Sequence, residues 1–184
     1  MAEDPLWAPW RLRYILSDKE KNGGTQPDVP TDQLLPDADP KCFLCQAVAD
    51  TMHDRQRHVV LRKERAIALL NLYPYNNGHT LVSPVRHVDH LDKLTDEEQL
   101  ESCQTITQIV QLLEKTMRPD GFNIGLNLGH GAGAGLPDHL HWHVVPRWNG
   151  DTNFMLVTAS TNVIPQSLEA LWLLLAEELG QKTE

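Results

Sequence analysis

Three histidines alternate with apolar residues over positions 139–145, in the run His-Leu-His-Trp-His-Val-Val. Successive side chains of a β-strand point to opposite faces, so this run predicts a strand with His139, His141 and His143 in a row on one face. The other face is apolar and suits a protein core; it is formed by Leu140, Trp142 and Val144. A strand whose histidines merely face solvent is the alternative. Strict alternation of three imidazoles directly after a glycine-rich loop favours a functional site.

The charge of the chain argues against a general nucleic-acid-binding protein. With 16 basic and 25 acidic residues among 184, the net charge is −9, whereas nucleic-acid binders usually carry a basic surplus. A small anionic substrate is compatible with this charge, provided that backbone N–H groups, histidines and a few arginines form a local site. Arg86 and Arg147 lie close in sequence to the histidine-rich motifs.

Neither a membrane segment nor an export signal is expected. No apolar run approaches the roughly 18 residues of a membrane span, and the first residues, Met-Ala-Glu-Asp, lack the basic and apolar regions of a signal peptide. Three cysteines, two of them in a Cys-x-x-Cys pair, do not make a disulfide framework. We therefore expect a cytoplasmic protein.

The chain is long enough for one domain with a sizeable core, preceded by two distinct segments. Residues 1–16 contain Trp7 and Trp10 among basic residues and form an expected N-terminal arm, which either packs on the domain or completes a substrate pocket or a dimer. Residues 17–40 are rich in Asp, Pro, Gly and Lys and predict a flexible loop. The domain itself is expected over residues 41–184.

Hydrophobic periodicity predicts several strands and two main helices within this domain. The expected strands cover residues 58–61, 65–71, 79–83 and 122–127, in addition to the histidine strand. Residues 96–117 keep the apolar spacing of a helix after a capping box that begins at Thr95, and Cys103 within this helix is expected to be buried or half-buried. A second helix is expected over residues 166–179, closed by Gly180.

Two further motifs have chemical potential. Cys42 and Cys45 are spaced so that the turn between them brings both thiolates to one zinc ion, which would need two more ligands; a redox pair or two buried thiols would also fit. The glycine-rich loop over residues 129–135 lets backbone N–H groups approach a phosphate closely.

Together these motifs resemble the histidine triad (HIT) family. Residues 139–145 are similar to its His-x-His-x-His-x-x signature, and residues 76–84, followed by Arg86 and His87, look like its Gly-His-x-Leu-Val-x-Pro strand. The N-terminal Leu-Trp-Ala-Pro-Trp-Arg, the Cys-x-x-Cys pair and residues 133–139 resemble the branch of diadenosine tetraphosphate phosphorylases (ATP adenylyltransferases). The expected fold is α+β, an antiparallel sheet of about five strands with two main helices, and the resemblance implies a homodimer.

The resemblance implies an enzyme that cleaves dinucleoside polyphosphates or AMP conjugates through a covalent intermediate. His141 would attack the α-phosphorus of a nucleotide, and water or phosphate would then release the nucleotidyl group. His143 would contact the phosphate and hold the charge that develops on it. The further nucleotide- and phosphate-binding residues implied by the resemblance are Asn71, His79, Asn127, Gly133 and Gly135. For Asn71 and Asn127, capping of turns by the side chains is the alternative.

A structural zinc site is also implied, and no organic cofactor is expected. In relatives with a Cys-x-x-Cys pair, the first motif histidine and a histidine after the Ser-Pro segment complete the ligand set, which here gives Cys42, Cys45, His87 and His139. Four protein ligands leave no position for a catalytic water. His90 is the alternative to His87. If the cysteines are simply reduced, His139 would instead orient His141 as a member of the catalytic triad.

One departure from the family lies just before the first histidine. Many relatives carry a Ser or Thr there that assists the leaving group, whereas this chain has Gly-Leu-Pro followed by Asp138. Either Asp138 acts instead, or the leaving group is a polyphosphate that needs no proton. Two other functions stay open: a redox protein that uses Cys42 and Cys45, and a non-catalytic module that binds purine nucleotides.

Overall fold

The structure is a computed structural model and describes residues 29–152 and 163–181. The expected N-terminal arm (residues 1–16) and the first part of the expected loop (residues 17–28) lie outside these ranges, so the domain boundaries stay a prediction. Residues 29–40 include a short 3-10 helix, η1 (Thr31–Gln33). This segment contacts the domain at its first residue, where the Val29 backbone N–H donates to the Gln46 side chain at 2.6 Å.

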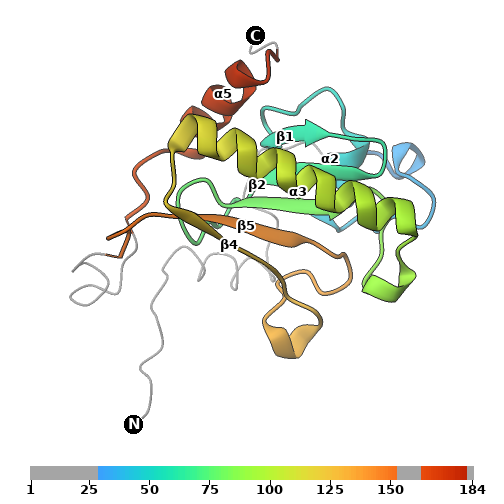
Figure 1. The fold of residues 1–184 in the computed structure, drawn as a ribbon. Helices are drawn as coiled ribbons and strands as arrows, with labels where there is room; N and C mark the ends of the chain where they lie inside the picture. The colour runs from blue at the N-terminus through green and yellow to red at the C-terminus, as the bar shows by residue number, and fades with distance from the viewer. Residues whose placement is uncertain (1–28, 153–162, 182–184) are drawn as a thin grey trace.

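Five antiparallel strands form one sheet in the order β1-β2-β3-β5-β4 (Figure 1). β1 (Val59–Arg62), β2 (Ala66–Leu70) and β3 (Thr80–Pro84) follow one another as a meander. β4 (Gly121–Leu126) forms one edge of the sheet, and β5 (Trp142–Arg147) lies between β3 and β4. The expected α+β fold with a five-stranded antiparallel sheet is confirmed.

Helices cover both faces of this sheet. The long α3 (Asp96–Met117) and the C-terminal α5 (Leu168–Glu178) pack on one face. The short α2 (Phe43–Ala49) lies on the opposite face, behind β1 and β2 in Figure 1. The sheet is thus the middle layer of the domain.

The sheet divides the core into two parts. Even-numbered strand residues such as Val82 and Val144 pack with α3 and α5, where Ile109 and Leu175 are almost fully buried. Odd-numbered residues face the other way, and Leu81 packs in a second cluster that includes α2. Strand alternation therefore decides which layer each residue contacts.

Both long helices that the periodicity predicts are present. α3 spans residues 96–117 as expected, and its capping box is formed, with the Glu98 N–H donating to Thr95 Oγ1 at 3.2 Å. The C-terminal helix begins at Leu168 instead of residue 166, because the Ser167 hydroxyl accepts the N–H of Ala170 and caps the helix there. It ends at Glu178.

One local expectation was wrong, and one short helix was not expected. Cys42 is the N-cap residue of this helix, α2, and Cys45 lies on its first turn; seven residues are too few to show a helical period. The helix depends on a distant side chain, since Arg62 of β1 donates to the Ala47 carbonyl at 2.7 Å. Cys103 is exposed, because it lies about 100° around α3 from the buried stripe.

The histidine strand begins later than expected. β5 starts at Trp142, so residues 139–141 precede the ladder with β3. Pro84, the last residue of β3, has no N–H with which to continue that ladder. The segment before β5 is held differently, since the Leu140 N–H donates to the Val88 carbonyl at 2.7 Å. β3 and the segment before β5 separate at this point, and the site described below forms there.

Candidate functional site

His141 and His143 lie side by side on the sheet face opposite α3. Their ring centroids are 5.1 Å apart. The alternating residues Trp142 and Val144 pack in the core on the α3 side, as the pattern predicts. His141 is buried and His143 is half-buried. The chain thus presents two adjacent imidazoles on one face, which we call the imidazole pair.

One hydrogen bond fixes which nitrogen of His141 carries the proton. Nδ1 lies 2.8 Å from the backbone carbonyl oxygen of His139. A carbonyl only accepts, so Nδ1–H is the donor and Nε2 keeps its lone pair. Burial lowers the pKa of His141, which favours the neutral ring. His141 can therefore present an unprotonated nitrogen to an electrophile.

His143 contacts another histidine, which is fully buried. His143 Nδ1 lies 2.9 Å from His79 Nε2, and His79 Nδ1 accepts the backbone N–H of Tyr75 at 3.0 Å. The Tyr75 ring stacks on His79 with centroids 4.8 Å apart. Burial, together with the nearby His143 and His141, lowers the pKa of His79 to about 3. The resemblance implies that His79 binds the nucleotide, whereas the structure places it against His143 with 1% of its surface exposed.

Asn71 caps a turn and contacts the same buried histidine. Its Oδ1 accepts the N–H of Tyr73 at 3.0 Å, and its Nδ2 lies 3.3 Å from His79 Nδ1. The turn-capping alternative is therefore observed for Asn71. A ribose-binding role for this half-buried side chain stays a prediction.

The glycine-rich loop connects β4 to the histidine segment. Leu126 pairs with Trp142, so Asn127 directly follows the last paired residue of β4. Gly133 has φ +80°, in the left-handed region that favours glycine, and Gly135 is exposed. The structure thus places all three residues on one loop that leads into the imidazole pair, while their binding roles stay predictions.

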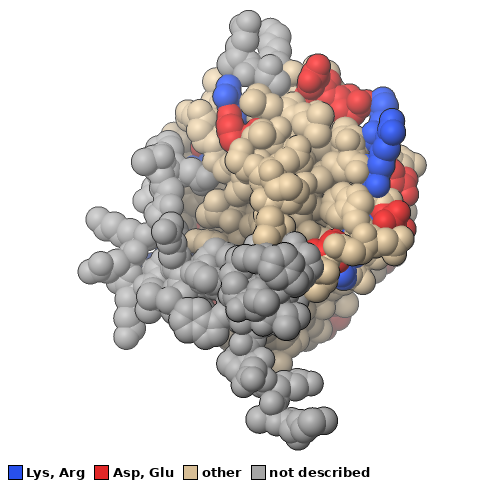
Figure 2. Space-filling view, turned by 90° about the vertical axis from the view of Figure 1, so that its left-hand side faces the viewer, with Lys and Arg blue, Asp and Glu red and all other residues tan. Residues whose placement is uncertain are grey.

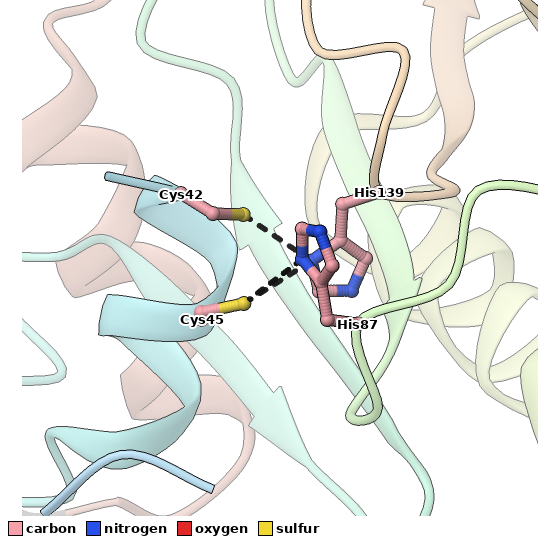
Figure 3. Close-up of side chains that lie close together, drawn as sticks. All are labelled: Cys42, Cys45, His87 and His139. Atoms are coloured by element: carbon pink, nitrogen blue, oxygen red, sulfur yellow. Dashed lines mark hydrogen bonds between the residues drawn. The ribbon is translucent and has the colours of Figure 1, made fainter. Parts of the chain in front are cut away.

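Two cysteines and two histidines converge in a buried cluster (Figure 3). Cys42 and Cys45 point from the start of α2 towards His87, in the loop after β3, and His139, just before β5. Cys42 Sγ lies 3.3 Å from His139 Nδ1, and Cys45 Sγ lies 3.2 Å from His87 Nδ1. The four candidate ligand atoms are within 4.8 Å of one another. All four residues of the expected zinc site are therefore brought together.

The donor set of this cluster fits zinc. Tetrahedral zinc with Zn–S bonds of about 2.3 Å and Zn–N bonds of about 2.0 Å separates neighbouring ligand atoms by about 3.3 to 3.8 Å, close to the sulfur–nitrogen distances of 3.2 and 3.3 Å here. His139 Nε2–H donates to the Pro84 carbonyl at 3.0 Å, which leaves the Nδ1 lone pair facing the sulfurs. A hydrogen bond with Cys42 lowers the pKa of Cys45 to about 4, so a thiolate is available.

Burial of the cluster bears on the alternatives. His90 is exposed beside Asp92, at 3.5 Å, and His87 is the histidine that joins the cluster. Cys42 and Cys45 are 0% and 3% exposed, whereas thiol–disulfide exchange requires access for a second thiol. The geometry therefore favours a metal site over redox chemistry.

The two arginines near the motifs are both engaged in ion pairs. Arg86 donates two hydrogen bonds, of 2.9 and 2.7 Å, to Glu98 at the start of α3. Arg147 donates to Asp151 at 2.6 Å and to Asn123 at 2.8 Å. Because these carboxylates balance both charges, an anion at the imidazole pair would depend mainly on backbone N–H groups and on the histidines.

A cavity of about 310 Å³ lies farther along β5, and neither His141 nor His143 lines it. Its wall includes Val145 and Arg147, the next odd-numbered residues of β5, so it lies on the same sheet face as His143. Tyr75 also lines it, and the Tyr75 ring lies 5.7 Å from the His143 ring. Tyr75, which stacks on His79 beside His143, is a neighbour of the site that the sequence pattern missed, since it stands in a turn-rich loop without a recognisable period.

Most of the charged side chains visible in Figure 2 lie at the top and right of the described surface, beside a wide uncharged area. Among the described residues on this face, no broad basic patch is visible.

None of the helices in the described ranges has the length and apolar character needed to cross a membrane.

Two similarities to known proteins are found at the level of sequence. Residues 53–150 match the HIT domain family. The chain is 38% identical over 180 residues to AP-4-A phosphorylase of Mycobacterium tuberculosis, an alignment that covers 96% of this chain and 85% of that protein.

Two solved structures share the fold. A Zn-bound histidine triad family protein from Mycobacterium smegmatis has a TM-score of 0.54 and 28% identity, covering 66% of this chain and 83% of its own. A hypothetical histidine triad nucleotide-binding protein from Sulfolobus tokodaii has a TM-score of 0.56 and 25% identity, covering 67% and 83%. The family match and the relative that aligns over almost the whole chain lead to one conclusion: the chain belongs to the HIT family.

Proposed function

We propose that this protein cleaves dinucleoside polyphosphates of the diadenosine tetraphosphate type by nucleotidyl transfer through His141. The observation that carries the proposal is the His141 ring itself, which is buried, neutral and held by the His139 carbonyl with its Nε2 lone pair available. Near-full-length similarity to an AP-4-A phosphorylase supports this substrate class.

The first step transfers a nucleotidyl group to the enzyme. His141 Nε2 forms a bond to the α-phosphorus, and the bond from that phosphorus to the bridging oxygen breaks. With diadenosine tetraphosphate, ATP leaves and AMP stays on His141 as a phosphoramidate. The Nδ1 proton remains hydrogen-bonded to the His139 carbonyl and stabilises the positive charge that the ring acquires.

The second step returns His141 to its starting state. Inorganic phosphate attacks the same phosphorus to give ADP, or water attacks to give AMP and a released proton, and in both cases the phosphorus–Nε2 bond breaks. His143 and the backbone N–H groups near Gly133 and Gly135 would stabilise charge on the phosphate oxygens. Asn71 would bind the ribose, and Asn127 the phosphate side.

The proposed leaving group needs no proton from the enzyme. No hydroxyl side chain stands directly before His139, and Asp138 is exposed. A polyphosphate leaves as a stable anion and needs no proton, which fits the proposed substrate better than an amine leaving group. The substrate class thus agrees with the departure of this chain from many HIT proteins.

A zinc ion held by Cys42, Cys45, His87 and His139 would serve as a structural crosslink. Four protein ligands would fill its tetrahedral shell, so it would join α2 to the segment before β5 and take no part in bond breaking. The Zn-bound relative and the convergent donor atoms support this assignment.

We further propose a homodimer that forms through β4. This strand is at the edge of the sheet, so one side of its backbone is unpaired within the described sheet. Ile124 on this strand and Leu128 in the loop after it are 48% and 39% exposed. An apolar edge strand is a favourable surface for pairing with a second copy of the chain.

Intact-protein mass spectrometry tests the catalytic proposal. Brief mixing with diadenosine tetraphosphate should add the mass of one AMP to the wild type and none to His141→Ala, while His90→Ala, which alters an exposed histidine, should behave as wild type. Formation of ADP only with added phosphate would mark a phosphorylase, and formation of AMP without it a hydrolase.

Nucleotide binding without an adduct would contradict the proposal. In that case, AMP would bind to the wild type with unchanged protein mass and no product would form. The non-catalytic module would then be the correct interpretation of the site.

A further inference from the structure

A chain of hydrogen bonds reaches His143 from the loop that follows β2. The Tyr73 N–H donates to Asn71 Oδ1 at 3.0 Å. This contact fixes the orientation of the amide, so that Nδ2 faces the His79 ring, 3.3 Å from Nδ1. The Tyr75 N–H donates to His79 Nδ1 at 3.0 Å. The contacts from Asn71 and Tyr75 thus meet at one fully buried imidazole, that of His79.

The contact from the Tyr75 backbone determines the tautomer of His79. A backbone N–H only donates, so His79 Nδ1 must accept and cannot carry a proton. A neutral imidazole has a single N–H, which is then on Nε2. Burial keeps His79 neutral, because it lowers the pKa of this ring to about 3.

The same logic extends to the next ring. His79 Nε2–H lies 2.9 Å from His143 Nδ1, so His143 accepts this bond. The single proton of neutral His143 must then be on Nε2. The Tyr75 ring stacks on His79 and lies 5.7 Å from His143, which holds the two imidazoles in this arrangement.

We infer that His79 is a positioning residue that holds His143 in the Nε2–H tautomer, so that His143 donates a hydrogen bond to the phosphate of the substrate. The inference rests on the proposed nucleotidyl transfer and assigns a role to a residue that does not touch the reacting atoms. The opposite tautomer would turn a lone pair towards a phosphate oxygen, which repels it.

The two rings of the imidazole pair are thereby locked in opposite states. A carbonyl takes the Nδ1 proton of His141 and leaves its Nε2 as a lone pair, whereas an N–H is donated to Nδ1 of His143 and leaves its Nε2 as a donor. With centroids 5.1 Å apart, one ring offers a nucleophile and the other an N–H to the same phosphate group.

A pair of amide variants tests this role. Gln at position 79 places an amide near the Nε2 position of the original ring and can donate to His143, whereas Asn is too short and reaches only the Nδ1 position, where it can accept from Tyr75. We expect His79→Gln to keep adenylylation of His141 within a few-fold of wild type. His79→Asn should slow it by about 10- to 100-fold, by analogy with the range for outer partners of metal-ligating histidines.

Nitrogen-15 NMR of the ligand-free protein reads the tautomer without relying on activity. Wild type and His79→Gln should show a protonated Nε2 and an unprotonated Nδ1 for His143, and His79→Asn should lose this pattern. Thermal unfolding shows whether each variant is folded. If His79→Asn fails to fold, the wild-type spectrum alone decides.

Two results would overturn the inference. One is a wild-type His143 with its proton on Nδ1; the other is equal adenylylation rates for folded His79→Asn and the wild type. A correct tautomer without any adduct on His141 would instead contradict the proposed function and leave the hydrogen-bond assignment intact.

Discussion

At the scale of single residues, the histidines of this site differ because their ring nitrogens have different partners. His139 donates to the Pro84 carbonyl, and His141 donates to the His139 carbonyl. His143 accepts from His79. The three rings have the same chemistry, but the partner of one nitrogen makes His139 a candidate metal ligand, His141 a nucleophile and His143 a hydrogen-bond donor.

Alternation in the sequence predicted which rings share a face, but not these partners. His139 lies outside the ladder between β3 and β5, and its ring enters the cysteine cluster. His79 was expected at the nucleotide because its motif resembles a binding strand. Its contact with His143 depends on the register of β3 against β5, which pairs Leu81 with His143 and cannot be read from either segment alone.

Gly78 directly precedes His79, and its backbone conformation and close neighbours leave no room for a side chain. It has φ +79°, and an added Cβ would lie 2.9 Å from Met117 Sδ and 3.0 Å from Pro146 Cγ. We expect Gly78→Ala to lower the free energy of unfolding by about 1–3 kcal/mol, because strain and overpacking add. Urea denaturation measures this change.

Gly121→Ala is the matched control for this prediction. A Cβ at Gly121 meets no atom within 4 Å, and its φ is not in the left-handed region. The control should retain wild-type stability within about 0.5 kcal/mol. Equal midpoints for the two variants would show that Met117 and Pro146 move aside at no cost.

At the scale of elements, α2 is held by contacts that come from outside it. Arg62 of β1 binds the carbonyl groups at its C-terminal end, and the cysteines at its start face His87 and His139. The long α3 was predicted to the residue, because its apolar period and capping box are local. The short α2 was missed, because what stabilises it is distant in sequence.

Metal removal should therefore loosen α2. We expect one zinc per chain in the wild type and in His90→Ala, and loss of zinc on dialysis of His87→Ala. A metal whose free concentration is about 100 times its dissociation constant raises the free energy of unfolding by about 2.7 kcal/mol. Chelation should therefore lower Tm by about 5–11 °C. Elemental analysis and thermal unfolding measure both effects. Equal zinc content in His87→Ala and the wild type would rule out this ligand set.

At the scale of the whole molecule, the order of the strands leaves β4 as an edge. If a second copy pairs there, a charge on the apolar edge should separate the two chains. We expect Ile124→Lys to sediment as a single chain under conditions where the wild type sediments as a dimer. Leu100→Lys on α3, at a residue that is 59% exposed, should leave the dimer intact. A wild type that sediments as a single chain would exclude the homodimer.

The strand order also has a consequence for how the molecule folds. β5 is the last strand among the described residues but pairs between β3 and β4, so His143 meets His79 across 64 residues and His139 meets Cys42 across 97. Contacts at such sequence separation form slowly, since a long loop must close first. A nascent or partly folded chain therefore has the three histidines but not the partners that set their protons. Reactivity arises only on completion of the native topology, so the rate at which the site gains activity during refolding would report the last step of sheet assembly.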